Sequence, residues 1–306
     1  MEIKRIPNVQ PENSNTPVTL KVCGNQSEIR YTVKKPIPCP VRKVDRDHGV
    51  DTRTGECIQY KHTKNRAEAK ANVAQSLRRL CDIINANLAE PERALWVTLT
   101  YAGTPMTEPK RLYEDFRRFW QRLQYYLKKR SFSKVEYILC AEPQARGSWH
   151  GHLLILFPHK APFVPNDDMA RLWGQGFTKT KALNNVDNIG LYLSCYLGDM
   201  ELTEAICAGT IGEGGTVKEI EAKDGAKKAY IKGARLSLYP PGFNIYRCSR
   251  GIKRPAIYQT TEKRAQEIIG AAPLVYEKTI RITDGLETKN IINYRQFNRA
   301  KGEYDR

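Results

Sequence analysis

Two histidines separated by one residue, His150 and His152, lie in an otherwise apolar stretch, and Glu142 precedes them in the chain. The apolar character of 149–157 predicts a strand, whose alternation places both imidazoles on one face. The turn-forming residues of 143–148 predict a hairpin that brings Glu142 opposite His150. Two imidazoles and one carboxylate that converge in this way form a site for one divalent cation, with donors that suit Mn²⁺ and tolerate Mg²⁺.

Two other interpretations of these three residues stay open. Alternating polar residues on a strand are usually the solvent-facing side of that strand. Two histidines and one carboxylate are also the iron ligands of non-haem oxygenases, so an iron oxygenase is the rival enzyme. The chain has only five histidines, however, and two of them fall in this one strand. This concentration, together with the carboxylate, favours a metal site over an ordinary polar face.

Tyr192 and Tyr196 lie four residues apart in a stretch, 186–197, whose pattern predicts a helix. That spacing places both phenols on one helical face. The same helix carries an apolar stripe, and tyrosines that merely flank a packed stripe are common. Beside a metal site, however, a tyrosine hydroxyl can attack a phosphodiester once a cation withdraws charge from the non-bridging oxygens.

The charge balance of the chain supports a polyanionic partner. Lys and Arg total 50 against 33 Asp and Glu, a formal charge of +17. A basic surface gains free energy on a phosphate backbone by releasing counterions, so nucleic acid is the expected partner. The predicted helix 107–129 is strongly basic over 110–130, and a second basic cluster is expected to contact phosphate. That cluster contains Arg247, Arg250, Lys253 and Arg254.

Three further residues near the predicted site are candidates for DNA contact. Thr98 and Thr100 point to one side of the strand predicted over 95–101, where they can reach a phosphate. Trp149 either stacks on a base, as aromatic side chains do in single-strand binding, or packs beside the turn. For the two threonines, β-propensity alone is the competing interpretation.

Several protein classes are not expected. The longest apolar run, Leu153 to Phe157, is far shorter than the ~18 residues of a membrane span. The N-terminal residues have no apolar stretch after their charges, so no secretory signal is expected. The eight cysteines form no C-x-x-C pair and are interpreted as reduced thiols. We therefore expect no membrane association and a cytoplasmic location.

The predicted elements define an α+β fold. Strand, helix, strand, strand, helix and strand follow one another from 95 to 181, which is the order of a ferredoxin-like antiparallel sheet with flanking helices. A helix over 66–88 precedes this core. The expected domains are an irregular N-terminal arm over 1–62 with two short strands, a catalytic domain over 63–255 with a flexible insertion at about 207–228, and a C-terminal extension over 256–306.

The order of three motifs, WVTLTY, EPQARGSWHGHLLIL and IGLYLSCYL, resembles that of the HUH endonucleases. Within that superfamily the chain is similar to the rolling-circle replication initiators of phages and plasmids, such as the gene II proteins of filamentous phages. The later segment YRCSRGIKRP resembles a basic stretch of the same branch. The resemblance covers about 66–255.

This resemblance implies a site-specific nickase and strand transferase. Glu142, His150 and His152 would bind Mg²⁺ or Mn²⁺, while Tyr192, Tyr196 or both would cut one DNA strand. The products would be a 5′-phosphotyrosine link and a free 3′-OH that primes synthesis, and a second tyrosine or a second copy of the protein would end the round. The implied partners are single-stranded DNA at a replication origin and, because no helicase-type phosphate loop is present, a host helicase and polymerase in the bacterial cytoplasm.

Two departures from the family pattern keep a third function open. The residue between the histidines is normally bulky and hydrophobic, but here it is Gly151. The family often has a lysine three residues after each tyrosine, whereas this chain has Cys195 and Asp199. Lys179 or Lys181 is a candidate substitute. Without such a lysine, a non-catalytic DNA-binding regulator on the same fold is the alternative.

Overall fold

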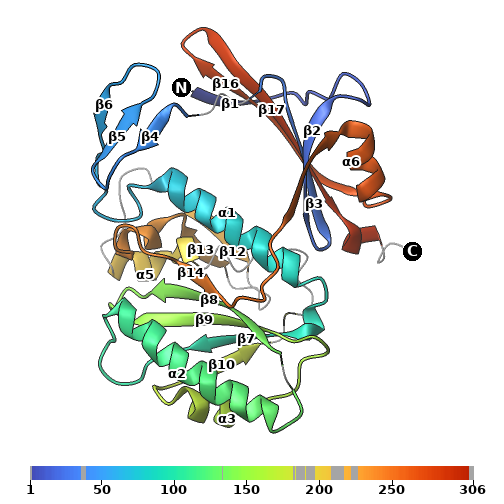
Figure 1. Ribbon diagram of the computed structural model, residues 1–306. Coiled ribbons are helices and arrows are strands. Elements are labelled where there is room, and N and C mark those ends of the chain that lie inside the picture. Colours follow the sequence, from blue (N-terminus) through green and yellow to red (C-terminus); the bar gives the residue numbers. More distant parts are fainter. Residues whose placement is uncertain are drawn as a thin grey trace. The chain divides into compact units, whose positions relative to one another are not determined.

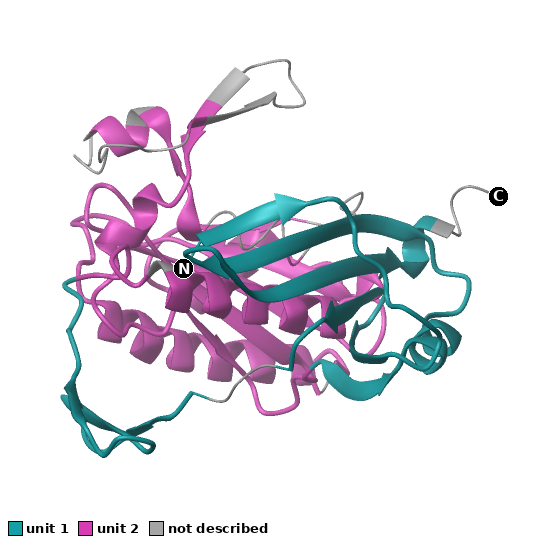
Figure 2. Ribbon diagram, turned by 90° about the horizontal axis from the view of Figure 1, so that it is seen from above, with its two compact units in different colours: residues 1–64, 255–306 teal, residues 65–254 magenta. Residues whose placement is uncertain are grey.

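The computed structural model describes residues 2–35, 39–132, 134–181, 183, 190, 197–207, 217–221 and 227–302. These residues form two compact units, the first built from 1–64 together with 255–306 and the second from 65–254 (Figure 2). We call them the two-ended unit and the central unit. Each is described here by itself.

A five-stranded antiparallel sheet organises the central unit. Its strand order is β10-β7-β9-β8-β14. The strands are β7 (Ala94–Leu99), β8 (Glu136–Pro143), β9 (Trp149–Leu156), β10 (Thr178–Lys181) and β14 (Tyr246–Cys248). With helices α2 (Pro109–Lys128) and α3 (Asn166–Trp173), the first four strands follow the order that the sequence predicts. The predicted α+β class is therefore confirmed.

Helices cover both faces of this sheet (Figure 1). The apolar side of α2 packs on one face, where Phe116 and Trp120 meet the ring of Tyr137 in β8 at centroid distances of 4.8 Å. On the other face lies α1 (Lys70–Asn87), whose Ile84 lines a small cavity together with Ile138 and His152. Since side chains alternate along a strand, residues that point toward α1 are separated from α2 by the sheet itself.

A smaller three-stranded sheet of β11 (Met200–Glu201), β12 (Val217–Glu221) and β13 (Lys227–Ile231) completes the central unit, with strand order β11-β13-β12. The short helix α5 (Leu202–Cys207) and the 3-10 turns η1 (Pro91–Arg93) and η2 (Ala234–Leu238) lie in the same unit. The stretch expected as a flexible insertion at 207–228 thus contains a paired strand, β12.

The two-ended unit is a six-stranded antiparallel sheet of order β1-β16-β17-β3-β2-β15. Its strands are β1 (Glu2–Ile6), β2 (Pro17–Cys23), β3 (Gln26–Thr32), β15 (Ala256–Thr261), β16 (Leu274–Asp284) and β17 (Glu287–Asn298). Helix α6 (Glu262–Ile269), capped by the Thr261 hydroxyl, packs on one face over Leu20 and Ile29. A separate ribbon of β4 (Val41–Lys43), β5 (His48–Asp51) and β6 (Cys57–Gln59) and the turn η3 (Arg299–Gly302) belong to the same unit.

The N-terminal segment therefore differs from the irregular arm with two short strands that was expected over 1–62, because six strands lie within it. For three of these strands the reason is non-local pairing: β1 pairs with β16, β2 with β15 and β3 with β17, from the other end of the chain, whereas β4, β5 and β6 pair with one another. Backbone hydrogen bonds to such distant partners stabilise strands whose own patterns are weak. None of the described helices combines the length and the apolar character that a bilayer span requires.

Candidate active site

The hairpin of β8 and β9 brings the three predicted metal ligands together. Glu142 pairs with His150 in the register, and His152 pairs with Cys140. The turn between them is closed by the Gln144 N–H, which donates to the Ser148 carbonyl at 2.8 Å. Because side chains alternate along both strands, the carboxylate and both imidazoles project from the same face of the sheet, which is the face covered by α1.

Glu142 is the centre of this cluster. Its carboxylate is 5% exposed, and Oε2 accepts a 2.7 Å hydrogen bond from Nε2 of His152. Nδ1 of His150 lies 3.7 Å from the same oxygen, and the Gln144 amide donates to it at 3.0 Å. The three side chains thus point their polar atoms at one position, as the spacing in the sequence predicts.

A buried arginine that the sequence analysis missed completes the cluster. Arg235 is 5% exposed, and its Nη2 lies 3.1 Å from Oε1 of Glu142. The same guanidinium forms a two-pronged contact with Glu204, at 3.2 and 3.0 Å, and Nη1 donates to the Pro143 carbonyl at 2.7 Å. Together with Nε, all five N–H donors of Arg235 have acceptors. The arginine therefore organises the site and has no donor left for a ligand.

Asp199 holds that arginine in place. This residue stands three positions after Tyr196, where the resemblance to the replication initiators implies a lysine. Its carboxylate accepts the Gly233 N–H at 3.0 Å, and its backbone carbonyl accepts Nε of Arg235 at 3.2 Å. Asp199, which stands where a lysine is expected, therefore anchors the segment that contains Arg235. This segment places the guanidinium of Arg235 beside Glu142. No local signal in the sequence points to this contact, because the two residues are far apart in the chain.

The electrostatics of the cluster favour a charged carboxylate. Burial raises the pKa of Glu142, but the hydrogen bond from His152 and the charges of His152, Arg235 and His150 outweigh it, so this pKa is lowered. Burial lowers the pKa of His150, although the charge of Glu142 opposes the change. A carboxylate that is charged next to a neutral imidazole is the protonation state in which both groups can serve as metal ligands.

The donor separations permit a divalent cation. Two ligands about 2.1 Å from an octahedral ion lie about 3 Å apart, and the distances from Glu142 Oε2 to the two imidazole nitrogens are 2.7 and 3.7 Å. Among the residues that the structure describes, no group of three or more His, Cys, Asp and Glu side chains is already arranged around a metal position. A cation bound between His152 and Glu142 would replace the hydrogen bond that joins Nε2 of His152 to Oε2 of Glu142.

A row of residues extends from the cluster across the sheet. Thr98 of β7 lies opposite His152, and its hydroxyl is 3.5 Å from Nδ1 of that ring. Lys179 of β10 lies opposite Thr98 and is exposed, and Lys181 lies opposite Trp96 in the next row. Both lysines therefore lie on the same face as the histidines. Lys179 stands two strands from His152, in the same row.

Two other positions serve packing, and Thr100, whose contact with phosphate stays a prediction, forms a backbone hydrogen bond. Trp149 is 4% exposed, its indole N–H donates to the Thr107 carbonyl, and its ring meets those of Tyr239 and Phe243. It is a packing residue, which corrects its assignment as a DNA-stacking side chain. The side chains of Leu99 and Leu139 cover Gly151, which leaves little space for the bulky residue usual at that position. The carbonyl of Thr100 accepts the Trp173 indole N–H.

The predicted basic surfaces lie on both sides of the sheet. The backbone of Lys253 hydrogen-bonds to Asn87 of α1, and Arg254 interacts with Tyr246, which pairs with Cys140 on the histidine face. Arg247, Arg250, Lys253 and Arg254 are all exposed. The guanidinium of Arg247 lies 3.5 Å from the ring centroid of Tyr113 in α2, on the side of the sheet away from the histidines. The exposed basic residues of α2 lie on that side too. The contact of these cations with phosphate stays a prediction.

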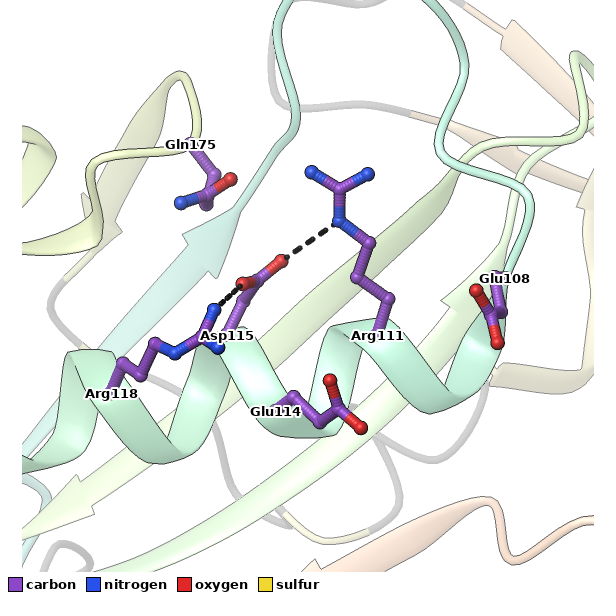
Figure 3. Close-up of a pocket in the computed structure, with 6 residues that line it drawn as sticks. All are labelled: Glu108, Arg111, Glu114, Asp115, Arg118 and Gln175. Atoms are coloured by element: carbon purple, nitrogen blue, oxygen red, sulfur yellow. Dashed lines mark hydrogen bonds and ion pairs between the residues drawn. The ribbon is translucent and has the colours of Figure 1, made fainter.

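A pocket of about 380 Å³ on α2 is also separate from the cluster (Figure 3). Asp115 lies at its floor between Arg111 and Arg118, and accepts a hydrogen bond from the Tyr101 hydroxyl at 3.0 Å. Three carboxylates and two guanidiniums line this pocket with Gln175. Because the lining carries no excess of positive charge, the pocket offers no site for a phosphate.

Tyr192, Tyr196 and Cys195 lie outside the described residues. Gly190 and Leu197, on either side of the two tyrosines, are described, and their contacts are with α1 and with Tyr239. The Gly190 N–H donates to Asn85 of α1 at 3.1 Å. The carbonyls of Leu197 and Ala141 lie 3.2 and 2.8 Å from the Tyr239 hydroxyl. Since Ala141 adjoins Glu142, the end of the tyrosine segment lies next to the cluster.

Comparison with known families identifies one match. Residues 94–201 match the family of replication-associated proteins that is described by its ORF2 and gene II protein members. The matched range contains Glu142, both histidines and both tyrosines. It confirms the resemblance to phage and plasmid replication initiators that the motifs indicate, and it supports a role in DNA replication. No curated protein and no solved structure matches the chain significantly.

Proposed function

Because residues 94–201 match this family of replication-associated proteins, we propose that the chain initiates rolling-circle replication by nicking one DNA strand at an origin. The observation that carries the proposal is the convergence of His150 and His152 on the buried carboxylate of Glu142 within the matched segment. We propose that Glu142, His150 and His152 bind one Mg²⁺ or Mn²⁺. When bound, the cation withdraws charge from the non-bridging oxygens of the scissile phosphate.

The nucleophile in this proposal is the hydroxyl of Tyr192 or Tyr196. Its oxygen forms a bond to phosphorus while the bond from phosphorus to the 3′ oxygen breaks. The phenolic proton leaves to solvent, and the 3′ oxygen gains a proton to become the free 3′-OH. The 5′ phosphate stays on the tyrosine until a 3′-OH attacks it in the reverse reaction, which rejoins the strand.

Lys179 and Thr98 are the side chains best placed to hold the phosphate in this scheme. Both lie on the histidine face, in the cross-strand row that contains His152. The exposed ammonium of Lys179 supplies the positive charge that Cys195 and Asp199 do not. Arg235 acts indirectly, because its N–H groups are all engaged and it keeps Glu142 oriented toward the histidines.

Covalent capture tests the proposal. Single-stranded oligonucleotides tiled across the replicon that encodes the chain are labelled at the 3′ end and incubated with protein and Mn²⁺. The protein should retain the labelled fragment on a denaturing gel, because it attaches to the 5′ phosphate of that fragment. Tyr192→Phe and Tyr196→Phe should differ, one abolishing the adduct and the other sparing first cleavage while impairing rejoining.

The controls separate this activity from its alternatives. The double tyrosine variant should form no adduct, whereas Tyr258→Phe, an exposed tyrosine of the two-ended unit, should behave as wild type. An adduct that persists in the double variant would show that neither tyrosine is the nucleophile. Specific DNA binding without any adduct would favour the non-catalytic regulator. Activity that requires Fe²⁺ and O₂ and leaves DNA intact would favour the oxygenase, which the family match and the +17 charge oppose.

After nicking, the free 3′-OH requires a polymerase and strand separation requires a helicase. We propose that the host supplies both in the bacterial cytoplasm.

A further inference from the structure

The six-stranded sheet of the two-ended unit has one face that α6 does not cover. The covered face carries the apolar side chains of Val18, Leu20 and Ile29 under α6. Strand alternation puts the neighbouring residues on the opposite face, which we call the open face. Its charged and aromatic residues include Arg5, Lys21, Arg30, Tyr276, Lys278 and Tyr294.

Two tyrosines and two cations of the open face lie side by side. Tyr294 of β17 pairs with Lys278 of β16 on one side and with Arg30 of β3 on the other. The Lys278 ammonium lies 6.0 Å from the ring centroid of Tyr276 and 5.4 Å from that of Tyr294. Tyr276 is 42% exposed, and Arg30 is exposed as well. Aromatic rings and positive charges therefore alternate across three neighbouring strands.

The charge of the open face is positive. Its four cations are Arg5, Lys21, Arg30 and Lys278, and the carboxylate among them is Glu28, which forms a 3.4 Å ion pair with Lys21. A second carboxylate of this face, Asp284, lies at the end of β16, away from the two tyrosines. Within the part of the chain that the structure describes, neither Arg30 nor Lys278 forms an ion pair with a carboxylate. Arg30 is exposed and Lys278 is half-buried. Both cations beside the tyrosine rings are thus available to an anionic partner.

These features match one class of ligand. Single-stranded nucleic acid presents flat bases, which stack on aromatic side chains, and phosphates, which bind nearby cations. A duplex does not expose base faces, so its contacts would use the cations alone. Diagonal neighbours on an antiparallel pair, such as Tyr276 and Tyr294, are about 7–8 Å apart, which leaves room for a separate base over each ring.

We propose that the open face binds single-stranded DNA, with bases on Tyr276 and Tyr294 and phosphates at Arg30 and Lys278. The choice of DNA over RNA rests on the proposed function, but the surface itself does not depend on the nicking chemistry. The chain would then hold its substrate strand at a second place in addition to the cleavage site.

The test measures binding of the full-length protein to a dye-labelled oligothymidine by fluorescence anisotropy, with EDTA present so that no covalent product forms. The double variant Tyr276→Ala/Tyr294→Ala should weaken binding about 30-fold or more, the change expected when two bases each lose about 1–3 kcal/mol of stacking. Tyr258→Ala is the matched control. Tyr258 is 46% exposed in the same sheet but pairs with Leu20, on the covered side, so its loss should leave the Kd unchanged.

Salt dependence tests the two cations. Each phosphate contact contributes about −0.7 to the log–log slope for single strands, so Arg30→Ala/Lys278→Ala should make the slope about 1.4 shallower. Folding of each variant is checked by circular dichroism. An unchanged Kd in the folded tyrosine variant would overturn the proposal, as would a slope that the cation variant leaves unaltered.

Two further measurements distinguish single-strand binding from dimer formation and from the nicking chemistry. Oligomeric state is measured for wild type and both variants, and loss of a dimer in the variants would overturn the DNA assignment by showing that the face joins two copies. Adduct formation on a short oligonucleotide is measured in parallel. If the adduct never forms but the tyrosine variant still loses binding, the proposed nicking function fails while the open-face proposal stands.

Discussion

The two units each bury one arginine against a glutamate, and the two pairs have different consequences. Arg235 of the central unit is 5% exposed and Arg295 of the two-ended unit is 6% exposed. Each guanidinium forms a two-pronged contact, Arg235 with Glu204 at 3.2 and 3.0 Å and Arg295 with Glu262 at 2.7 and 2.6 Å. In contact geometry and in the burial of the arginine the two pairs are similar.

What surrounds the pairs differs. Arg235 also reaches Glu142, the carboxylate that contacts both histidines, and all of its N–H groups have acceptors. Arg295 ties the first turn of α6 to β17, and its Nε has no hydrogen-bond partner in the described part of the chain. A buried ion pair is therefore not by itself a sign of function. What indicates function is the second carboxylate, Glu142. It contacts both the arginine and the two histidines that are proposed to bind a metal.

The largest expected effect comes from removing the carboxylate that distinguishes the two pairs. Glu142→Gln keeps the shape of the side chain but removes the charged oxygen from a proposed metal ligand. Loss of groups behind metal ligands already costs about 10–100-fold in affinity, so this variant should weaken Mn²⁺ binding by more than about 100-fold, measured by calorimetric titration.

The matched control for that experiment is Glu262→Gln, the corresponding change in the other unit. It should leave Mn²⁺ affinity and adduct formation as in wild type. Equal Mn²⁺ affinity in Glu142→Gln and wild type would remove the metal site from the proposal.

Breaking the other pair should affect stability alone. Arg295→Met leaves the partly buried Glu262 carboxylate with the Gln266 amide as its remaining partner, which should cost about 1–3 kcal/mol. Hydrogen exchange of peptides from β3 and β17 should accelerate by about 5- to 150-fold, while peptides from β8 and β9 and the rate of adduct formation stay unchanged. A loss of adduct formation at wild-type stability would contradict the structural role of this pair.

A smaller effect is expected when residue 235 keeps a positive charge but loses the guanidinium group. Arg235→Lys cannot satisfy Glu142, Glu204 and two carbonyls at once, because a lysine lacks the planar fork of donors. Glu142 should then be less well oriented, with Mn²⁺ affinity about 10-fold weaker. Arg122→Lys is the control, since Arg122 donates to the carbonyls of Leu172 and Trp173 away from the histidines. Identical Mn²⁺ affinities for the two variants would refute a positioning role.

The smallest effect concerns pH. Burial raises the pKa of Glu262, but hydrogen bonds from Arg295 and Gln266 outweigh it, so the folded-state pKa lies below the ordinary value of 4.5. A lowered carboxylate pKa stabilises the fold above the unfolded pKa, and this stabilisation is lost as the pH falls through the folded pKa. Wild type should therefore exceed Glu262→Gln in urea resistance by a constant margin from pH 7 to about pH 5, and the margin should shrink at lower pH. A margin that grows on acidification would reverse the assigned sign.

Local patterns in the sequence were sufficient for the core of the central unit. The apolar character of 149–157, the turn at 143–148 and the helical periodicity of 107–129 each depend on neighbouring residues. They therefore predicted the ferredoxin-like order and the meeting of Glu142 with His150 and His152 without knowledge of the rest of the fold. The register of a hairpin follows from its turn, which is why this part of the site could be placed from the sequence.

The tertiary structure alone decided which distant residues meet that hairpin. Arg235 contacts Glu142 across a long stretch of chain, and β2 and β3 find β15 and β17 at its other end. Such contacts produce no periodic pattern in the sequence, because any arginine that the fold places nearby could pair with a buried carboxylate. Trp149 shows the same limit: a tryptophan beside a turn can be exposed or buried, and only the packing of Tyr239 and Phe243 against its ring determined that it is buried.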